Sequence, residues 1–408
     1  MRYGYLSDYF SGVAAKRLRE VEVNPQKSNQ HELNGAEPLK RLLTLNEFYN
    51  RPASFIWLGG ENEGISAEGW VSWYDARKNN PNRAAEWRLY YPNNAVMELA
   101  SAGDILIVAR LADDRLAFVV APQGTTLENQ LLWLFGLEDG LGDLFHIEEF
   151  GDGNDRELDF AARYILEELG IEIQEPDADR LDALLERFGA AFPTTREFSV
   201  FARETIDVPP VLEAPDEALI AWMTHEEALF RRLERHVVSD RLAKGFAAEG
   251  AIDVDGFLHF SLSVQNRRKA RAGFALENHL EAIFETHEVR FVRGAETENR
   301  AKPDFLFPGV AEYHDPGYPA GRLTILGAKS TCKDRWRQVL SEAERISHKH
   351  LLTLEPGISE NQTSEMQANN LQLVVPAPIH RTYSTAQTAW LIDVSGFLEL
   401  ISRKQTAS

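Results

Sequence analysis

The chain has 408 residues, of which 44% are hydrophobic and 26% are charged. This composition is typical of a globular protein with room for two domains, and it excludes a disordered or fibrous chain. The longest apolar runs, 116–122 and 131–137, fall far short of the roughly 18 residues that span a bilayer, and residues 1–20 lack the hydrophobic middle of a signal peptide. The single cysteine, Cys332, excludes a disulfide framework. We therefore expect a cytoplasmic protein with no membrane contact.

Net charge is unevenly distributed along the chain. The 43 basic and 63 acidic residues give −20, which by itself argues against a nucleic-acid partner. However, residues 138–186 hold 17 acidic and 3 basic residues, so this one segment contributes −14 of the total. The segment 265–271 (QNRRKAR) has four basic residues in seven, and 329–349 has six basic against three acidic. Because local charge decides whether a surface contacts DNA, the composition does not exclude a DNA partner.

The first third of the chain is predicted to be rich in β-strands. Aromatic and β-branched runs between Gly, Asn, Pro and Asp clusters predict strands at 54–58, 69–74, 86–91, 104–110 and 115–121. The last two flank Asp113 and Asp114 and are expected to form a hairpin. Thr125 and Glu128 stand at capping-box spacing before an apolar stripe, which predicts the start of a helix. We expect a β-rich domain at 1–185 that ends in an acidic helical tail.

The second half has the alternation of helices and strands that is typical of an α/β domain. Helical periodicity at 221–246 and 274–287 is followed by apolar runs that predict strands at 303–307, 323–329 and 371–375, with a further helix at 334–352. Pro and Thr interrupt the periodicity around 192–195 and 208–215. We therefore place the domain boundary near residue 190 and the second domain at 190–408.

Two of the predicted strands carry charged residues that are costly to place beside apolar neighbours. Asp304 follows Pro303 within the first strand, and Lys329 closes the run LTILGAK. An aspartate and a lysine on adjacent strands, with a further carboxylate nearby, form the PD-(D/E)XK nuclease site, in which carboxylates hold Mg²⁺ and the lysine stabilises charge on a phosphate. The alternative is structural: a salt-bridged aspartate and a lysine that reaches solvent at the strand ends.

The second carboxylate of that motif needs a different origin here, because Gly327 occupies the position two residues before Lys329 where it usually stands. Glu342 lies thirteen residues after Lys329 on the predicted helix, where its side chain could turn back toward the strand ends. The segment that joins them (KSTCKDRWRQVLSE) closely resembles the catalytic segment of EcoRII-like type II restriction endonucleases. In this branch of the PD-(D/E)XK nucleases, the acidic residue has migrated to that helix.

The resemblance extends over residues 195–385, about half of the chain. Five blocks follow the family's order and approximate spacing, at 263–273, 276–284, 302–308, 313–315 and 371–380. It implies an α/β restriction-endonuclease-like fold in which Asp304, Lys329 and Glu342 form the catalytic set, with Asp304 and Glu342 as Mg²⁺ ligands. Glu277 matches an extra acidic residue that many such nucleases carry; a solvated helix glutamate is the alternative.

Two basic clusters are candidates for DNA contact. In the resembling family, the trio that corresponds to Lys333, Asp334 and Arg335 reads consecutive C:G pairs in the major groove. The alternative is a charge cluster at the start of a helix, with Asp334 as the N-cap. The second cluster lies on a predicted loop before the first nuclease helix, and phosphate contact is favoured over a merely solvated loop. Its members are Arg267, Arg268, Lys269 and Arg271.

The amino-terminal domain carries a basic, aromatic-bearing loop between two predicted strands. Some EcoRII-like enzymes place a B3-like β-barrel before the nuclease, which binds a second copy of the DNA site, and the order of strands and loop here is similar. The residues expected to contact this effector DNA are Arg77, Lys78, Arg83, Trp87 and Arg88. The alternative is a domain that only stabilises or dimerises the protein.

The residues and the resemblance together predict a homodimeric, Mg²⁺-dependent type II restriction endonuclease that cuts double-stranded DNA at a short C:G-rich site. A homodimer is expected because two DNA strands of opposite polarity require two sites related by a twofold axis. No nucleotide cofactor is expected, because the glycines at 59–64 lack the order of a phosphate loop. The alternatives are a modification-dependent endonuclease whose amino-terminal domain reads a modified base, and a non-catalytic DNA-binding regulator.

Overall fold

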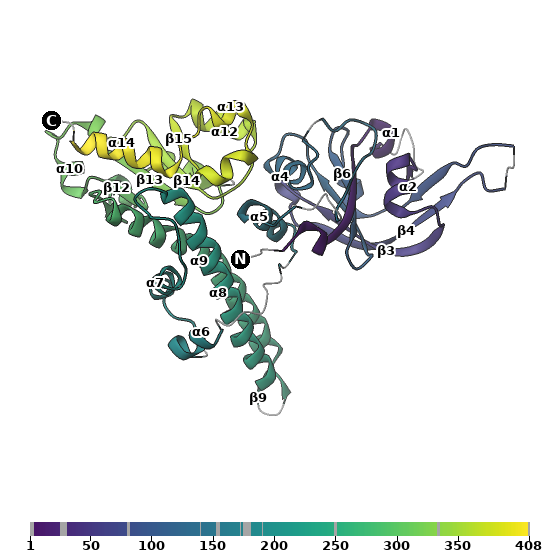
Figure 1. Ribbon diagram of the computed structural model, residues 1–408, viewed down its shortest axis with the longest axis horizontal. Helices are drawn as coiled ribbons and strands as arrows, with labels where there is room; N and C mark the ends of the chain where they lie inside the picture. Colours follow the sequence, from purple (N-terminus) through teal and green to yellow (C-terminus); the bar gives the residue numbers. More distant parts are fainter. Residues whose placement is uncertain are drawn as a thin grey trace. The chain divides into compact units, whose positions relative to one another are not determined.

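The computed structural model describes residues 4–24, 31–79, 82–138, 140–151, 156–171, 173, 181–189, 191–248, 251–332 and 335–406. The chain packs into two compact units (Figure 1). The first comprises Met1–Ile173 together with Pro356–Gln362, and the second comprises Gln174–Glu355 together with Thr363–Ser408. The predicted boundary near residue 190 falls within the second unit, on a residue outside the described ranges.

The first unit is built on an eight-stranded sheet with the order β2-β5-β4-β3-β7-β6-β1-β8. Its strands are β1 (Phe10–Arg17), β2 (Glu32–Asn34), β3 (Phe48–Trp57), β4 (Ser66–Asp75), β5 (Trp87–Tyr90), β6 (Ile105–Leu111), β7 (Leu116–Ala121) and β8 (His146–Glu149). Neighbours are antiparallel except for β3 and β7, which are parallel. All five predicted strands are confirmed, including the β6–β7 hairpin, whereas the sequence analysis missed β1, β2 and β8.

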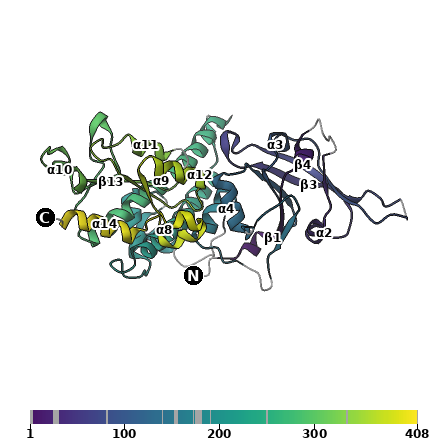
Figure 2. The same cartoon turned by 90° about the horizontal axis from the view of Figure 1, so that it is seen from above.

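Two hydrophobic cores cover the two faces of this sheet. The helical segments around it are η1 (Leu6–Asp8), α1 (Glu20–Val23), α2 (Glu37–Leu43), η2 (Gly60–Asn62), α3 (Ala95–Leu99), α4 (Thr126–Phe135) and α5 (Phe160–Glu168). On β6, Ile105 and Ile107 belong to the core with α4 and α5, while Leu106 and Val108 belong to the core with α2 and α3. Figure 2 shows α4 on one side of the sheet and α2 and α3 on the other. Because successive strand residues face opposite ways, burial of both faces produces the continuous apolar run that identified β6 in the sequence.

The predicted helix start at Thr125 is confirmed. The Thr125 hydroxyl accepts a hydrogen bond from Glu128 N, and the Glu128 carboxylate accepts one from Gly124 N. Among the described strand pairings, β2 and β8 each have a single neighbour, so the sheet is open as paired. The B3-like barrel therefore stays a prediction.

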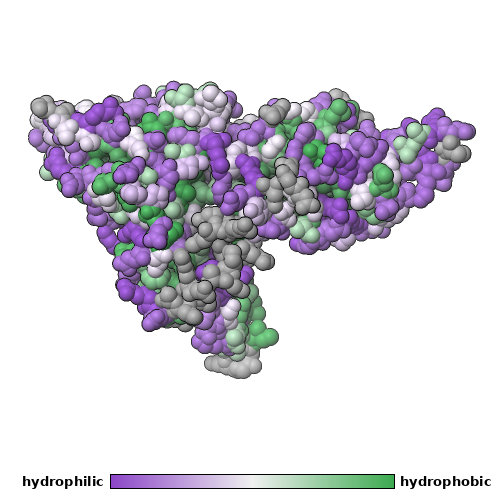
Figure 3. Space-filling view, viewed as in Figure 1, coloured by the Kyte–Doolittle hydropathy of each residue, from purple (hydrophilic) through white to green (hydrophobic). Residues whose placement is uncertain are grey.

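The second unit begins with helices, of which two are long. They are α6 (Leu181–Phe188), α7 (Thr195–Glu204), α8 (Pro215–Lys244) and α9 (Val254–Thr286); α8 and α9 pack together as a hairpin whose turn carries β9 (Ala247–Ala248) and β10 (Ala251–Ile252). Figure 3 shows apolar side chains at the end of this hairpin, where Ile252, Val254 and Leu262 are exposed. None of the helices in the described ranges is both long enough and apolar enough to cross a membrane.

One sequence prediction about these helices is wrong. The basic segment 265–271 was expected to be a loop, but it lies in the middle of α9. The helix begins earlier than predicted because the Asp253 side chain caps it by accepting a hydrogen bond from Gly256 N at 2.8 Å. Arg268 and Arg271 pair with acidic residues on α8, and these ion pairs favour the helical conformation of the charge-rich segment.

A five-stranded mixed sheet forms the rest of the second unit. The strands β11 (Val292–Arg293), β12 (Phe305–Phe307), β13 (Thr324–Lys329), β14 (Lys349–Thr353) and β15 (Leu371–Val374) are neighbours in that order. Pairing is antiparallel from β11 to β13 and parallel from β13 to β15. The remaining helical segments are η3 (Glu298–Arg300), α10 (Val310–His314), η4 (Ala320–Arg322), α11 (Trp336–Leu340), α12 (Glu360–Ala368), η6 (Ala377–Thr382), α13 (Thr385–Thr388) and α14 (Val394–Thr406). The expected α/β class is confirmed for this unit.

The predicted helix at 334–352 is also wrong. Of the described residues 335–352, the α-helix covers only α11, and the apolar residues at the far end of the stretch form the buried strand β14. Ala343 has a φ of 50°, in the left-handed region that ends a helix, and a short apolar run fits a buried parallel strand as well as a helix face. Glu342 therefore lies in a loop after α11.

A buried carboxylate, that of Asp216, joins helical segments of the second unit that are far apart in the sequence. Asp216, in the first turn of α8, accepts hydrogen bonds from Ala377 N at 3.0 Å, Val394 N at 2.8 Å and Ser395 N at 3.0 Å. Burial raises the pKa of Asp216, while these donors oppose that effect. Asp216 thereby links the start of α8 to the starts of η6 and α14.

Candidate active site

Asp304 and Lys329 meet at the ends of two adjacent strands. Asp304 directly precedes β12, Lys329 is the last residue of β13, and the antiparallel pairing of these strands brings the two side chains together. Asp304 Oδ2 accepts hydrogen bonds from Lys329 Nζ at 2.8 Å and from Ala328 N at 2.7 Å. The side chains are 17% and 23% exposed, so the pair is shielded but accessible.

The Glu342 carboxylate lies within electrostatic reach of this pair. Burial is the main cause that raises its pKa to about 7; the negative charge of Asp304 adds to the increase, while Lys329 and Lys349 oppose it. Its Oε2 atom is buried and has no hydrogen-bond partner among the described residues. A buried carboxylate oxygen without a partner is costly, so this side chain is suited to a ligand that supplies positive charge.

Two cations fix the loop that carries Glu342. Lys349 Nζ donates to the carbonyl oxygens of Leu340, at 2.7 Å, and of Glu342. Arg345 donates to the carbonyls of Tyr313, Asp315 and Tyr318. Sequence reasoning missed both residues, because their acceptors are backbone carbonyls that leave no pattern in the side chains.

The donor set fits a hard divalent cation. Asp304 and Glu342 supply carboxylate oxygens, and the unsatisfied Glu342 oxygen is the atom that gains most from a bound cation. Among the described residues, no three His, Cys, Asp or Glu side chains gather closely enough to hold a metal by themselves. Mg²⁺ commonly uses only one or two protein carboxylates and completes its shell with water and substrate oxygens. Asp304 and Glu342 are therefore the residues that would hold it.

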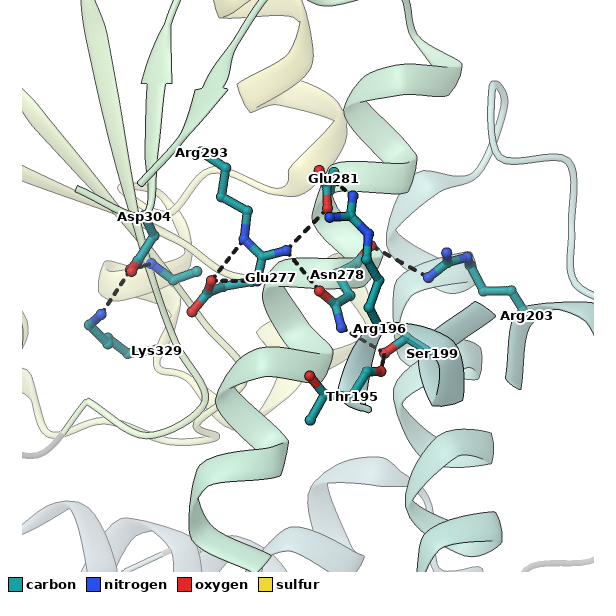
Figure 4. Close-up of polar contacts among 11 residues, drawn as sticks. Thr195, Arg196, Ser199, Arg203, Glu277, Asn278, Glu281, Arg293, Asp304 and Lys329 are labelled. Carbon is teal, nitrogen blue, oxygen red and sulfur yellow. Dashed lines mark hydrogen bonds and ion pairs between the residues drawn. The ribbon is translucent and has the colours of Figure 1, made fainter. Parts of the chain in front are cut away.

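Glu277 approaches the pair from α9 and is held by an arginine that the sequence analysis did not identify. Its Oε2 accepts hydrogen bonds from Arg293 Nε at 3.0 Å and Nη2 at 2.7 Å (Figure 4). Burial is the main cause of its raised pKa; the charge of Asp304 adds to the increase, while Arg293 and Lys329 oppose it. The alternative of a freely solvated glutamate does not fit, since the side chain is only 18% exposed.

The segment between Lys329 and Glu342 holds the candidate base-reading residues. Lys333 and Asp334 lie outside the described residues, whereas Arg335 is exposed directly before α11. The loop is anchored through Cys332, whose N donates to the buried Glu355 carboxylate and whose carbonyl accepts from Arg335 N at 2.8 Å. The Cys332 thiol is fully buried, and burial raises its pKa, so it serves packing.

The basic side chains of α9 are largely engaged within the second unit. Arg268 pairs with the buried Glu234 carboxylate at 2.5 Å. Arg271 is 5% exposed and pairs with Glu226 at 3.3 Å and with Glu227. Arg267 lies over the ring of Phe192, 4.0 Å from its centroid, and the side chain of Lys269 is outside the described residues.

The candidate effector-DNA residues of the first unit are paired or packed in a similar way. Arg77 and Arg88 both contact Glu86, and Lys78 contacts Glu47. Trp87 stacks on Trp73 with ring centroids 5.0 Å apart, so one face of its indole is used in the core. Arg83 is exposed.

Comparison with known proteins bears out the resemblance in the carboxyl-terminal half. Residues 230–398, which include the site just described, match the family model for the EcoRII C-terminal domain. A curated relative, the type II restriction enzyme EcoRII of Escherichia coli, is 38% identical over 235 residues, which are 56% of this chain and 55% of that protein. The chain thus spans about half the length of the curated relative that it matches.

Two solved structures are also similar. Metal-depleted Ecl18kI in complex with uncleaved, modified DNA has a TM-score of 0.45 and 19% identity, over 56% of this chain and 85% of that chain. A complex of the restriction endonuclease PspGI with substrate DNA has a TM-score of 0.42 and 14% identity, over 57% of this chain and 98% of that chain.

Proposed function

We propose that this chain is a type II site-specific restriction endonuclease, which hydrolyses phosphodiester bonds in double-stranded DNA at a short C:G-rich site. The observation that carries the proposal is the Asp304–Lys329 pair with the buried, unpartnered Glu342 carboxylate beside it. Such an arrangement lowers the stability of the fold, and proteins retain buried charges of this kind where their chemistry uses them. A protein that only binds DNA does not need them.

We propose Mg²⁺ as the cofactor, with Asp304 and Glu342 as its protein ligands. When bound, Mg²⁺ supplies Lewis-acid stabilisation of the phosphate that is attacked. Lys329, whose amine lies 2.8 Å from Asp304 Oδ2, contributes a fixed positive charge at the same place and stabilises the charge that develops on the phosphate oxygens. Glu277 is the auxiliary carboxylate, held on α9 within electrostatic reach of Asp304.

Recognition of the DNA sequence is proposed to come from the loop between β13 and α11. Arg335 is exposed there and would donate to guanine O6 and N7, with Lys333 and Asp334 as the other members of the trio. We keep the phosphate-contacting role for Arg267 and Lys269. We assign Arg268 and Arg271 to the α8–α9 interface, because their guanidinium groups are held by Glu234 and Glu226.

We further propose that the protein acts as a homodimer and that the first unit is a B3-like domain that binds effector DNA. Dimerisation follows from cleavage of both strands at a symmetric site. Arg77, Lys78 and Arg88 would have to exchange their acidic partners for phosphates, which is electrostatically feasible because these ion pairs are partly or largely exposed.

The test is digestion of methylated and unmethylated plasmid by the full-length protein with Mg²⁺ or with EDTA. Discrete fragments from unmethylated plasmid, formed only with Mg²⁺ and lost with Asp304→Ala, are the expected result. Cleavage confined to the methylated plasmid would replace the proposal with a modification-dependent endonuclease. Binding of DNA without cleavage of either plasmid would favour the regulator.

A further inference from the structure

We propose that Arg293 is a positioning residue for the proposed nuclease reaction, which holds the Glu277 carboxylate in place beside Asp304. This inference rests on the proposed function. Arg293 lies on β11, outside the Asp304, Lys329 and Glu342 set, and nothing in the sequence distinguished it from the other arginines.

The Arg293 guanidinium binds one face of α9 through four hydrogen bonds. Two end on Glu277 Oε2, a third joins Nη1 to Asn278 Oδ1 at 2.7 Å, and the fourth joins Nη1 to Glu281 Oε2 at 3.1 Å. In Figure 4 the second oxygen of Glu277 points away from the guanidinium and carries none of the drawn contacts. The planar donor array of arginine suits this arrangement, since it fixes several acceptors at once.

The backbone at Arg293 and Gly294 also fixes the position of Asp304. Arg293 stands opposite Phe305 in the β11–β12 pairing, and Gly294 N donates to Asp304 O at 3.1 Å. Arg293 therefore contributes to both carboxylates: its side chain holds Glu277, and its strand, β11, pairs with the strand that follows Asp304. Two carboxylates near each other repel, so α9 needs this cation to keep Glu277 close to Asp304.

The acceptors of Arg293 are themselves fixed from α7. Asn278 is 5% exposed, and its Nδ2 donates to Ser199 Oγ at 3.0 Å; Ser199 Oγ donates to Thr195 O at 2.9 Å. Glu281 Oε1 accepts from Arg196 at 2.8 Å. Because these partners hold the acceptors from the other side, Arg293 has one orientation in which all its bonds form. A polar network of this kind orients the groups at its end.

The experiment is a double-mutant cycle in full-length protein, read as single-turnover cleavage of cognate DNA with saturating Mg²⁺. Arg293→Gln should slow cleavage by about 10- to 100-fold, the usual effect of losing a residue that orients a metal-site carboxylate. The same change made in Glu277→Gln should have at most about a twofold effect, because the carboxylate that Arg293 positions is already neutral. DNA affinity in EDTA should stay within about twofold of wild type.

The matched control is Arg290→Gln. Arg290 stands three residues before Arg293, is exposed, and its guanidinium pairs with Glu312 at 3.0 Å, outside the network that holds Glu277, so cleavage should stay within about twofold of wild type. Arg293→Lys keeps the charge without the planar donor array and should recover part of the lost rate. This variant also keeps the test decisive if Arg293→Gln folds poorly. A folded lysine variant that cleaves more slowly than wild type would support a requirement for the planar donor array, and one that cleaves at the wild-type rate would contradict it.

The outcomes separate the two levels of inference. If Arg293→Gln cuts as fast as wild type, or slows cleavage equally with and without the Glu277 carboxylate, the positioning role is wrong and the proposed function stands. If wild type and Arg290→Gln both fail to cleave any DNA with Mg²⁺, the proposed function is wrong, and the positioning role falls with it.

Discussion

The basic surface of the first unit and the Asp304 site of the second both gather charged side chains, but they balance their charges differently. Around Glu47 and Glu86, the acids are matched by Lys78, Arg77 and Arg88. At the Asp304 site, Glu277 and Glu342 each lie within electrostatic reach of Asp304, and an oxygen of Glu342 is buried without a hydrogen-bond partner. A buried carboxylate oxygen without a partner is the better indicator of chemistry, because matched ion pairs near a surface cost little to keep.

The strongest test of this comparison is Asp304→Ala. We expect cleavage to fall by more than about a thousandfold, roughly 4 kcal/mol, because the substitution removes a proposed metal ligand and the partner of Lys329. DNA binding in EDTA should be largely retained. Single-turnover cleavage and filter binding measure the two quantities, and a loss of less than about tenfold would remove Asp304 from the site.

A matched pair of glutamates tests the unpartnered carboxylate. Glu342→Gln should abolish cleavage, while Glu344→Gln, two residues further in the same loop, should change it by less than about threefold, roughly 0.7 kcal/mol. In EDTA, Glu342→Gln should also raise the melting temperature by a few degrees, because an amide costs less to bury than a carboxylate. Equal cleavage by both variants would show that Glu342 is not the second carboxylate of the active site.

Arg271→Met tests whether the basic residues of α9 serve packing. Arg271 is buried against Glu226, so its removal takes a cationic partner from a buried carboxylate and should lower the free energy of unfolding by about 3 kcal/mol. The salt dependence of DNA binding should not change. A stable variant whose binding weakens for all DNA sequences, with the salt slope reduced by about one, would instead assign Arg271 to phosphate contact.

Arg335→Ala should have the smallest effect, a loss of about 1–3 kcal/mol in binding to cognate DNA with relaxed discrimination at one C:G pair. The control is Arg337→Ala, two residues further on, whose guanidinium is paired with Glu365 at 2.9 Å and about half exposed. Binding to single-base variants of the site measures both. A loss for Arg335→Ala that is uniform across sequences would assign it to phosphate contact.

The Asp304–Lys329 pair could be predicted from the sequence because both residues stand at strand ends, where an apolar run stops at a charged residue. The sequence predicted the elements around Glu342 poorly: the apolar residues of β14 fit a helix face and a buried strand equally well, and the left-handed backbone at Ala343 has no glycine to signal it. Arg293 and Lys349 were missed because what matters is their acceptors, which come together only in the folded chain.

The Asp216 carboxylate has a consequence for how the second unit folds. Its hydrogen-bond donors lie 161 to 179 residues further along the chain. The α8–α9 hairpin can form from contacts that are closer in sequence, but Asp216 stays hydrated until η6 and α14 arrive, and closing so long a loop is slow. We therefore expect amides at the start of α14 to gain protection from hydrogen exchange in the last step of folding, together with the ordering of the α8 amino terminus.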